Sequence, residues 1–459
     1  MAVSPSSSPQ TPPAVWDLFC TVLTPAWVAD WYRTHDLHGG GGLFSPLLTL
    51  WLLLNQRLAG RATNEQVWSQ LTLAQAQALS PHSRRLQTGS LSPHPSGYSY
   101  ARQHLPLSVI EAAADLLYQD LHRRFVGPEQ REPPLFVLDG SSLTLPHSPA
   151  LAAAYPPAPN QHGVSHWPVV RLVVAHAVGT GLALRPVWGP MFGPQAVSEQ
   201  ALAQDLLPGL PVGAWVIADS NFGVFSVAWA LAQQQQVPVV RLQEARAQKV
   251  LGPAVDLAQH GDYAVRWTAS RLDHRTSPAL PVGATLQGRV VVRHVVHDGE
   301  QERLCLFTTA AATTCSAEQL VACYGQRVLI ETDLRSLKHS VALESTGVRS
   351  PALLAKDIVM AVAAYNVLRW IAAEAAATRQ LAPRRISFTR TLHYARAYAP
   401  RLAAAPDQAT RQQLWGALLT AIAAAPLPLR PRRRFPRQVW RKPQIYPAHR
   451  PTPSAAPAK

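Results

Sequence analysis

The segment YGQRVLIETDLRSLK, residues 324–338, combines residue types that can bind phosphate and metal ions. Its hydrophobic spacing predicts one helix, which at about 100° per residue would carry four polar side chains within about 60° of one another. These are Tyr324, Arg327, Glu331 and Lys338, with Arg335 close by. Such cations can bind phosphate, arginine through its planar fork and lysine as a point charge. Solvated salt bridges are the alternative, because the two arginines lie four residues from the glutamate on either side.

Two aspartates end predicted strands and can act together with Glu331. Asp139 ends the strand LFVLD, and Asp219 ends the strand WVIAD. Ligands gather at the strand ends of α/β sheets, so the three acids could converge there. Three carboxylates would hold Mg²⁺, or Mn²⁺ in its place, and two such ions can promote phosphoryl transfer. Taken singly, the acids also fit a turn at Asp139, a helix N-cap at Asp219 and a salt bridge at Glu331.

The order of strands and helices around these acids predicts an α/β fold. Three expected strands are followed by a helix, a strand, a helix and a fifth strand, which suits a mixed five-stranded sheet with helices. The expected strands are Leu135–Asp139, Val169–Val178, Leu182–Trp188, Ala214–Asp219 and Val237–Leu242, and the expected helices cover 198–206 and 222–235.

Changes in composition divide the chain into seven parts. The Ser/Pro-rich leader, 1–13, is expected to be disordered. The segment 14–130 is expected to be helical, with capping boxes that begin at Thr63 and Ser108. The other parts are a first part of the α/β core at 131–243, a β-rich insertion at 244–305, a second part of the core at 306–375, a C-terminal helical region at 376–429 and a basic Pro/Arg-rich tail at 430–459. Within the helical segment, TNEQVWSQLTLAQAQAL fits a helix-turn-helix that reads DNA and an ordinary helical hairpin equally well.

The charge of the chain points to nucleic acid. Lysine and arginine number 42 against 27 acids, which gives a formal charge of +15 and a pI near 10.2. Such an excess favours nucleic acid over membrane as the partner. In the tail we expect Arg432, Arg433 and Arg434 to contact DNA phosphate, with a solubilising tail as the alternative. The four cysteines form no CxxC pair, and no leader or apolar run of about 20 residues is found, so a cytoplasmic protein is expected.

These residues resemble those of the DDE transposases of the insertion-sequence-four group, cut-and-paste enzymes on an RNase H-like fold. The group's Tyr-x2-Arg-x3-Glu-x6-Lys motif is matched at every position, by Tyr324, Arg327, Glu331 and Lys338. The stretches ADSNFGVF and LFVLDGSSL resemble the group's segments around the second and first acid. The resemblance covers about residue 40 to 450. It implies that the core parts form the RNase H-like fold and that the N-terminal helical region binds DNA.

The resemblance also implies a mechanism and partners. Asp139, Asp219 and Glu331 would be the catalytic residues and the ligands of two Mg²⁺ ions, while the motif's phenol and cations would hold phosphates. One strand would be cut at the terminal inverted repeats of double-stranded DNA, the freed 3′-hydroxyl would form a hairpin, and a homodimer would join the reopened ends to target DNA. Ser220 replaces the group's usual arginine, so a weakened DNA-binding regulator or inhibitor is one alternative, and a plain endonuclease is another. Trp267 is a candidate to receive a flipped base.

Overall fold

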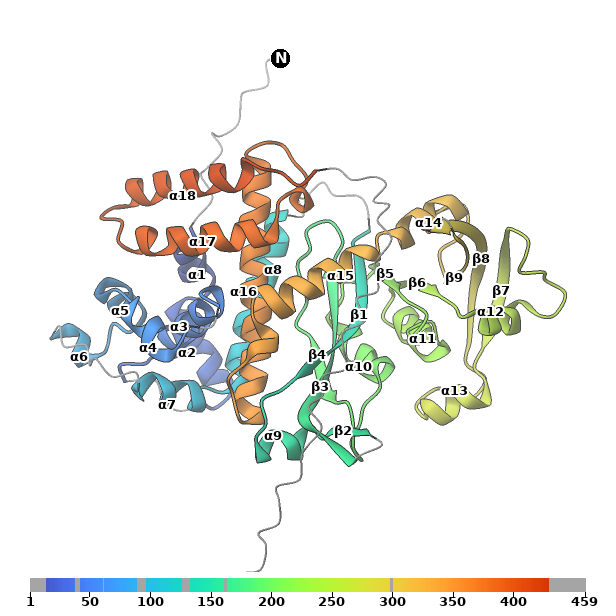
Figure 1. Ribbon diagram of the computed structural model, residues 1–459, viewed down its shortest axis with the longest axis horizontal. Coiled ribbons are helices and arrows are strands. Elements are labelled where there is room, and N and C mark those ends of the chain that lie inside the picture. The colour runs from blue at the N-terminus through green and yellow to red at the C-terminus, as the bar shows by residue number, and fades with distance from the viewer. Residues whose placement is uncertain are drawn as a thin grey trace, which may run out of the picture.

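The computed structural model describes residues 14–37, 42–60, 62–88, 96–125, 133–160, 163–297 and 300–428. The expected leader, 1–13, lies outside the described residues, and so does the basic tail with Arg432, Arg433 and Arg434. In the described part, helices from both ends of the chain lie on one side of a long central helix, and a sheet lies on the other (Figure 1).

One mixed sheet of nine strands runs through the described part of the chain. Its strands are β1 (Leu135–Thr144), β2 (Pro157–Asn160), β3 (Gly163–Ala177), β4 (Val187–Pro190), β5 (Trp215–Ala218), β6 (Val237–Arg241), β7 (Gly261–Thr268), β8 (Thr285–His297) and β9 (Glu300–Thr308). Their order is β2-β3-β1-β5-β6-β9-β8-β7, and β4 pairs with β3. Strand β1 is antiparallel to β3 and parallel to β5, which is parallel to β6. The predicted α/β class is therefore confirmed, with a strand arrangement that is consistent with an RNase H-like core.

The sheet differs from the prediction in two places. It does not end with the fifth core strand, because β9 pairs antiparallel with β6 and carries β8 and β7 with it. The strands expected in an insertion thus extend the core sheet (Figure 1). The third expected strand, Leu182–Trp188, is mostly irregular. Ala183 makes an isolated bridge with His176, and regular pairing begins only at Val187.

Helices form the N-terminal region. They are α1 (Val15–Val22), α2 (Pro25–Thr34), α3 (Pro46–Leu58), α4 (Asn64–Ser69), α5 (Leu73–Leu79), α6 (Arg84–Gln87), α7 (Ser96–His104) and α8 (Leu107–Phe125). The capping box at Thr63 is confirmed, since its hydroxyl accepts the backbone N–H of Gln66 at 3.1 Å and the Gln66 side chain accepts that of Thr63 at 2.8 Å. The one expected at Ser108 is wrong, because α8 begins one residue earlier and contains this serine.

The later helices alternate with the strands and then continue alone. They are α9 (Pro149–Ala154), α10 (Glu199–Leu206), α11 (Phe225–Gln233), α12 (Glu244–Leu251), α13 (Arg271–Thr276), α14 (Ala317–Gly325), α15 (Val328–Arg335), α16 (Pro351–Ala377), α17 (Phe388–Ala403) and α18 (Gln408–Ala423). Short 3₁₀ turns lie at Leu207–Gly209, Leu343–Ser345 and Pro383–Arg385, and a π-helical turn, η2, at Ser336–Ser340.

The two faces of the sheet belong to two different hydrophobic cores. Because side chains alternate along a strand, Phe136 and Leu138 face one core and Val137 faces the other. The first core contains the buried side chains of α10 and α11. The second contains those of α15, α16 and the N-terminal helices. We call them the α10 face and the α15 face of the sheet.

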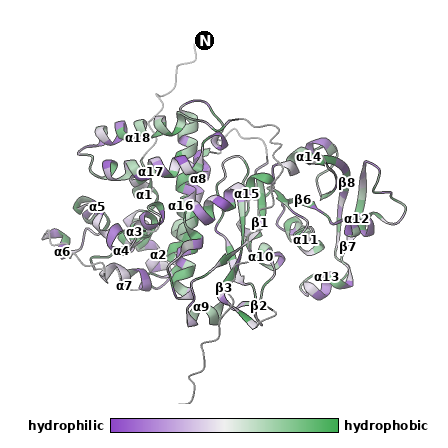
Figure 2. Cartoon of the chain, viewed as in Figure 1, coloured by the Kyte–Doolittle hydropathy of each residue, from purple (hydrophilic) through white to green (hydrophobic). Residues whose placement is uncertain are grey.

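The central helix α16 has the composition of a membrane span but is a core helix. It is the one described helix that is long and apolar enough to cross a membrane, and 83% of its apolar window is buried inside the protein. It packs against α3, α8, α17 and α18, and its hydrophobic residues stand out in Figure 2. The sequence expectation that no apolar run approaches the length of a membrane span did not anticipate this helix of 27 residues. Burial in the protein accounts for its composition.

Candidate active site

Asp139 and Asp219 lie side by side on neighbouring parallel strands. The last paired residues of β1 and β5 are Leu138 and Ala218, and each aspartate comes directly after one of them. Neighbouring strands lie about 4.8 Å apart. Both aspartates follow residues of the α10 face, so by alternation both side chains point to the α15 face. Two buried hydrophobic runs that each end in an aspartate thus place two carboxylates together.

The carboxyl group of Asp139 holds its proton more tightly than an ordinary aspartate. Burial, together with the negative charges of Asp219 and Glu199, raises the pKa of Asp139 from 3.8 to about 6. The N–H of Gly140, which donates to Asp139 Oδ1 at 2.8 Å, and the charge of Arg327 limit the rise. Burial and like-charge repulsion are the ordinary causes of such a shift, and they cluster at functional sites.

A tight turn holds the carboxylate of Asp219. The backbone N–H of Asn221 donates to Asp219 Oδ1 at 2.9 Å, so this acid is fixed by the turn after it and not by a helix cap. The alternative interpretation of Asp219 as a helix N-cap is therefore wrong, since α11 begins only at Phe225. The turn needs a glycine at Gly223, because a Cβ atom there would collide with the carbonyl oxygen of Arg241 on β6.

Residues 324–338 do not form the single helix that the sequence predicts. Helix α14 ends at Gly325, α15 begins at Val328, and the π-helical turn η2 follows at Ser336. Between the two helices the chain tightens to hydrogen bonds between residues three apart, such as those from Arg327 to Tyr324 and from Ile330 to Arg327. The predicted single face is therefore wrong in detail. Irregular helical turns of both kinds are frequent at functional sites.

Glu331 lies on the correct face of the sheet but does not join the two aspartates. Helix α15 packs against β1 on the α15 face, with Ile330 buried beneath it. The Glu331 side chain is 45% exposed, and its Oε1 lies 3.9 Å from Nη2 of Arg327. The charge of Arg327 also lowers the pKa of Asp139. Arg327 therefore interacts electrostatically with both the first acid and the third.

The other motif residues are divided between the site and solvent. Tyr324 is buried, which raises its pKa, and it lies close enough to Asp219, Arg327 and Arg241 for their charges to act on it. Arg335 is exposed on the outer side of α15. The structure thus brings the phenol near Asp219, whereas Arg335 is exposed and takes part in none of the contacts just described.

Lys338 reaches the strand that carries the first aspartate. Its Nζ donates to Oγ of Ser141, two residues after Asp139 on the same face of β1, at 3.2 Å. The same Nζ lies 2.7 Å from Oε1 of Glu344, whose other oxygen is 3.0 Å from Nδ1 of His339. The lysine expected to bind phosphate therefore has a carboxylate partner within the chain, which was not predicted from the sequence.

A buried ion-pair network fixes α15 against the rest of the protein. Asp333, two residues after Glu331 on the inner side of the helix, is fully buried between Arg369 of α16 and Arg384. Arg384 donates two hydrogen bonds to it, at 2.9 and 3.0 Å. Burial acts to raise the pKa of Asp333, but these cations outweigh it and the pKa is lowered. The network positions the helix that carries Glu331.

A fourth carboxylate, Glu199, approaches the first aspartate from the α10 face. It is the first residue of α10, which Ser198 caps by accepting the N–H of Ala201 at 3.1 Å. A Cβ atom on Gly140 would lie within 2.6 Å of Oε1 of Glu199. The sequence predicts this helix but assigns no role to Glu199. No local signal reveals it, because the contact joins residues 59 positions apart (199 − 140).

The prediction that Trp267 receives a flipped base is wrong. Its side chain is 5% exposed and packs edge-on against Phe225 and Phe307 in the core of the α10 face. A ring that is held in this way cannot stack on a base without unpacking the core. Trp267 therefore supports the fold.

Two carboxylates fit a divalent ion, but the full set of three is not assembled. Among the residues that the structure describes, no three His, Cys, Asp or Glu side chains are grouped closely enough to hold a metal ion. Asp139 and Asp219 offer hard oxygen donors, and their mutual repulsion is of the kind that a cation relieves. Glu331, the candidate third ligand on α15, lies beside Arg327.

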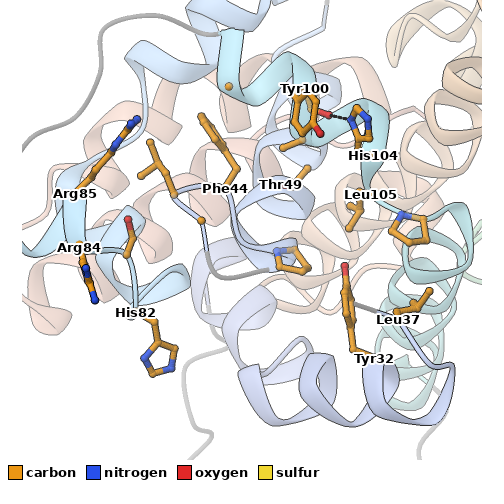
Figure 3. Close-up of a pocket in the computed structure, with 17 residues that line it drawn as sticks. Tyr32, Leu37, Phe44, Thr49, His82, Arg84, Arg85, Tyr100, His104 and Leu105 are labelled. Atoms are coloured by element: carbon orange, nitrogen blue, oxygen red, sulfur yellow. Dashed lines mark hydrogen bonds between the residues drawn. The ribbon is translucent and has the colours of Figure 1, made fainter. Parts of the chain in front are cut away.

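A separate pocket of about 850 Å³ lies among the N-terminal helices (Figure 3). Cationic side chains of α6 line one side of it. Aromatic side chains from α2, from α7 and from the segment just before α3 line the other. Tyr100 is 65% exposed, and its ring stacks on that of His104 at 3.8 Å. The residues that matter here are Tyr32, Phe44, Arg84, Arg85, Tyr100 and His104, and the described lining contains no acid.

In a comparison with known protein families, one family matches the part of the chain that holds the two aspartates. A family model described as "Transposase DDE domain" matches residues 130–367, just over half of the chain. The matched range includes Asp139, Asp219, Glu331 and Lys338. No curated protein matches the chain.

Proposed function

Because the chain belongs to the family of transposases with a DDE domain, we propose that it cuts DNA at the terminal inverted repeats of a mobile element and joins the ends to target DNA. Members of this family are polynucleotidyl transferases and endonucleases that use divalent ions. We further propose that the enzyme belongs to the insertion-sequence-four group, works by cut-and-paste with a hairpin intermediate, and prefers Mg²⁺, with Mn²⁺ as a substitute.

The observation that carries the proposal is the pair of aspartates on the α15 face. Asp139 and Asp219 follow directly on paired residues of two parallel strands, and the helix that bears Glu331 packs over the first strand. These three side chains would hold the ions, which supply a water of lowered pKa and positive charge at the reacting phosphate. The chain itself contributes their placement, through the turn after Asp219 and the buried Asp333 under Glu331.

The cations of the site are suited to hold the DNA backbone. We propose that Arg327 and Lys338 bind phosphates on either side of the aspartates, with Tyr324 packing beside Asp219. An incoming phosphate would compete with Glu344 for Lys338 and with Glu331 for Arg327. We infer that Glu331 turns toward the aspartates as a phosphate takes its place beside Arg327, so that DNA binding and completion of the acid set occur together.

The N-terminal helical region is the proposed contact for the DNA ends. The pocket in Figure 3 combines arginine and histidine with stackable aromatic rings and a described lining without acids. Cationic and aromatic side chains together are typical of nucleic-acid surfaces. Helices α4 and α5, which cover the possible helix-turn-helix, lie beside α3. We propose double-stranded DNA as the partner, a homodimer as the synaptic complex, and a DNA-associated location in the cytoplasm.

The proposal is tested with the purified protein, Mg²⁺ and a labelled duplex from the inverted repeats that flank the gene. On a denaturing gel we expect a nicked strand and then a hairpin for the unchanged protein. Asp139→Asn, Asp219→Asn and Glu331→Gln should each abolish both products while duplex binding in a gel shift persists. Asp205→Asn, at an exposed position of α10, is the matched control and should cut normally.

The outcomes separate the candidate functions. Cleavage retained in all three acid variants refutes the assignment of the site. Nicking without hairpin or joined product favours the plain endonuclease. Duplex binding without any cleavage by the unchanged protein favours the DNA-binding regulator, for which Ser220 in place of the group's arginine is the supporting feature.

A further inference from the structure

Glu199 touches the turn that holds the second aspartate and the strand that holds the first. On one side its carboxylate accepts a hydrogen bond from the side-chain amide of Asn221, two residues after Asp219. On the other it lies against the Cα atom of Gly140, the residue after Asp139. Only a residue without a Cβ leaves room for it there. The glutamate therefore links the middle of β1 to the turn after β5, on the face of the sheet opposite to the aspartate side chains.

The first turn of α10 holds Asn221 through both halves of its amide. Glu199 accepts from Asn221 Nδ2, and Nε2 of Gln200 donates to Asn221 Oδ1 at 2.7 Å and to its backbone oxygen at 2.8 Å. The backbone N–H of the same Asn221 donates to Asp219 Oδ1 at 2.9 Å. An unbroken series of hydrogen bonds thus runs from Glu199 to one of the two aspartates.

Glu199 is itself held in place, which a positioning role requires. Its side chain is 25% exposed, and its Oε1 lies 3.9 Å from Nε of Arg171 on β3. Arg171 is anchored in turn by a hydrogen bond from Nη1 to the carbonyl oxygen of Val197 at 2.6 Å, just before α10. Leu202 and Leu206 bury the helix in the core of the α10 face. The carboxylate is therefore fixed relative to both strands.

We propose that Glu199 is a positioning residue of the active site, which acts through Asn221 to orient Asp219 for its divalent ion. The inference rests on the proposed function, because it assumes that Asp219 holds an ion. Glu199 lies on the other face of the sheet from the aspartate side chains, so it acts on the site through the hydrogen bond and not as a ligand. Partners that orient a ligand in this way typically change metal affinity by about 10- to 100-fold when they are removed.

The test measures Mn²⁺ binding to the full-length protein without DNA, from the electron paramagnetic resonance signal of free Mn²⁺. Glu199→Ala and Asn221→Ala should each weaken binding by about 10- to 100-fold. The double variant should be no weaker than either single variant, because both changes break the same series of bonds. Glu199→Gln keeps an oxygen that can accept from Asn221 and should bind Mn²⁺ nearly as well as the unchanged protein.

Several outcomes overturn the proposal. Unchanged Mn²⁺ affinity in Glu199→Ala is one. A double variant whose loss of affinity is the product of the two single losses is another. The third is a loss of affinity in Glu199→Gln that is as large as the loss in Glu199→Ala. If Glu199→Ala does not fold, Asn221→Ala at its exposed position decides alone, since unchanged affinity there refutes the series of bonds. Asp219→Ala is measured alongside. Equal Mn²⁺ binding by Asp219→Ala and the unchanged protein contradicts the proposed function itself, which separates the two failures.

Discussion

Replacing Asp139 by asparagine should stabilise the protein in the absence of divalent ions. Burial and the neighbouring acids raise the pKa of this carboxyl from 3.8 to about 6 in the folded state. At neutral pH the folded protein therefore carries a charge that the unfolded chain carries at lower cost. A difference of about 2 pKa units corresponds to about 3 kcal/mol, an upper figure because water partly screens the site. Asparagine removes the charge and keeps an oxygen that can accept the N–H of Gly140.

The pH dependence has a defined sign. Because the folded pKa lies above the unfolded one, the folded state binds more protons between them, and its stability falls as pH rises through this window. The Asp139→Asn variant lacks this loss. Its advantage over the unchanged protein should be absent near pH 4, grow between about pH 4 and 6, and stay constant above that.

The assay is urea unfolding followed by tryptophan fluorescence at a series of pH values in a chelating buffer. Asp205→Asn, at an exposed position, should show no such advantage. Adding Mn²⁺ should then remove most of this advantage, since an ion at 100 times its dissociation constant stabilises the unchanged protein by about 2.7 kcal/mol and the variant much less. An Asp139→Asn protein that is less stable than the unchanged one at pH 8, or whose advantage does not vary with pH, would refute the assignment of a repelled, buried carboxyl.

Four further changes follow from single contacts. Gly223→Ala should sharply reduce the soluble yield, since its Cβ would strike a backbone oxygen. Gly416→Ala has open space around it and should express and melt normally, and equal behaviour of the two variants contradicts the packing of the turn. Asp333→Asn should cost about 3 to 5 kcal/mol in urea unfolding because it leaves buried arginines without a counter-charge, and a change below 1 kcal/mol contradicts the network. Trp267→Ala should cost about 3 to 5 kcal/mol of stability, and an unaltered urea midpoint would restore a surface role for this ring. Glu344→Gln should tighten duplex binding in a fluorescence titration by about two- to fivefold by releasing Lys338, and unchanged affinity refutes that competition.

The sequence by itself determined the local features of this protein. A run of buried residues that is followed by an acid is a pattern of neighbouring positions, so the strands that carry Asp139 and precede Asp219 could be found without a structure. The predicted strand end at Asp139 is wrong, because β1 continues to Thr144. The alternation of strands and helices likewise predicted the fold class, because each element's period is set by its own backbone. Even the end of α14 had a local signal in Gly325, because glycine weakens a helix, but the hydrophobic spacing outweighed it.

Only the tertiary structure decided which side chains meet. The contacts of Glu199 with Gly140 and of Lys338 with Ser141 join residues far apart in the chain, and no periodic pattern encodes which faces pack together. The same holds for Trp267, whose aromatic character suited a surface stack or a core equally until its neighbours were known. Hydrophobic patterning indicates that a face is buried, whereas the packing of the whole chain selects the surface that this face contacts. For this reason Glu331 and Arg327 could be identified from the sequence, but their positions relative to the aspartates could not.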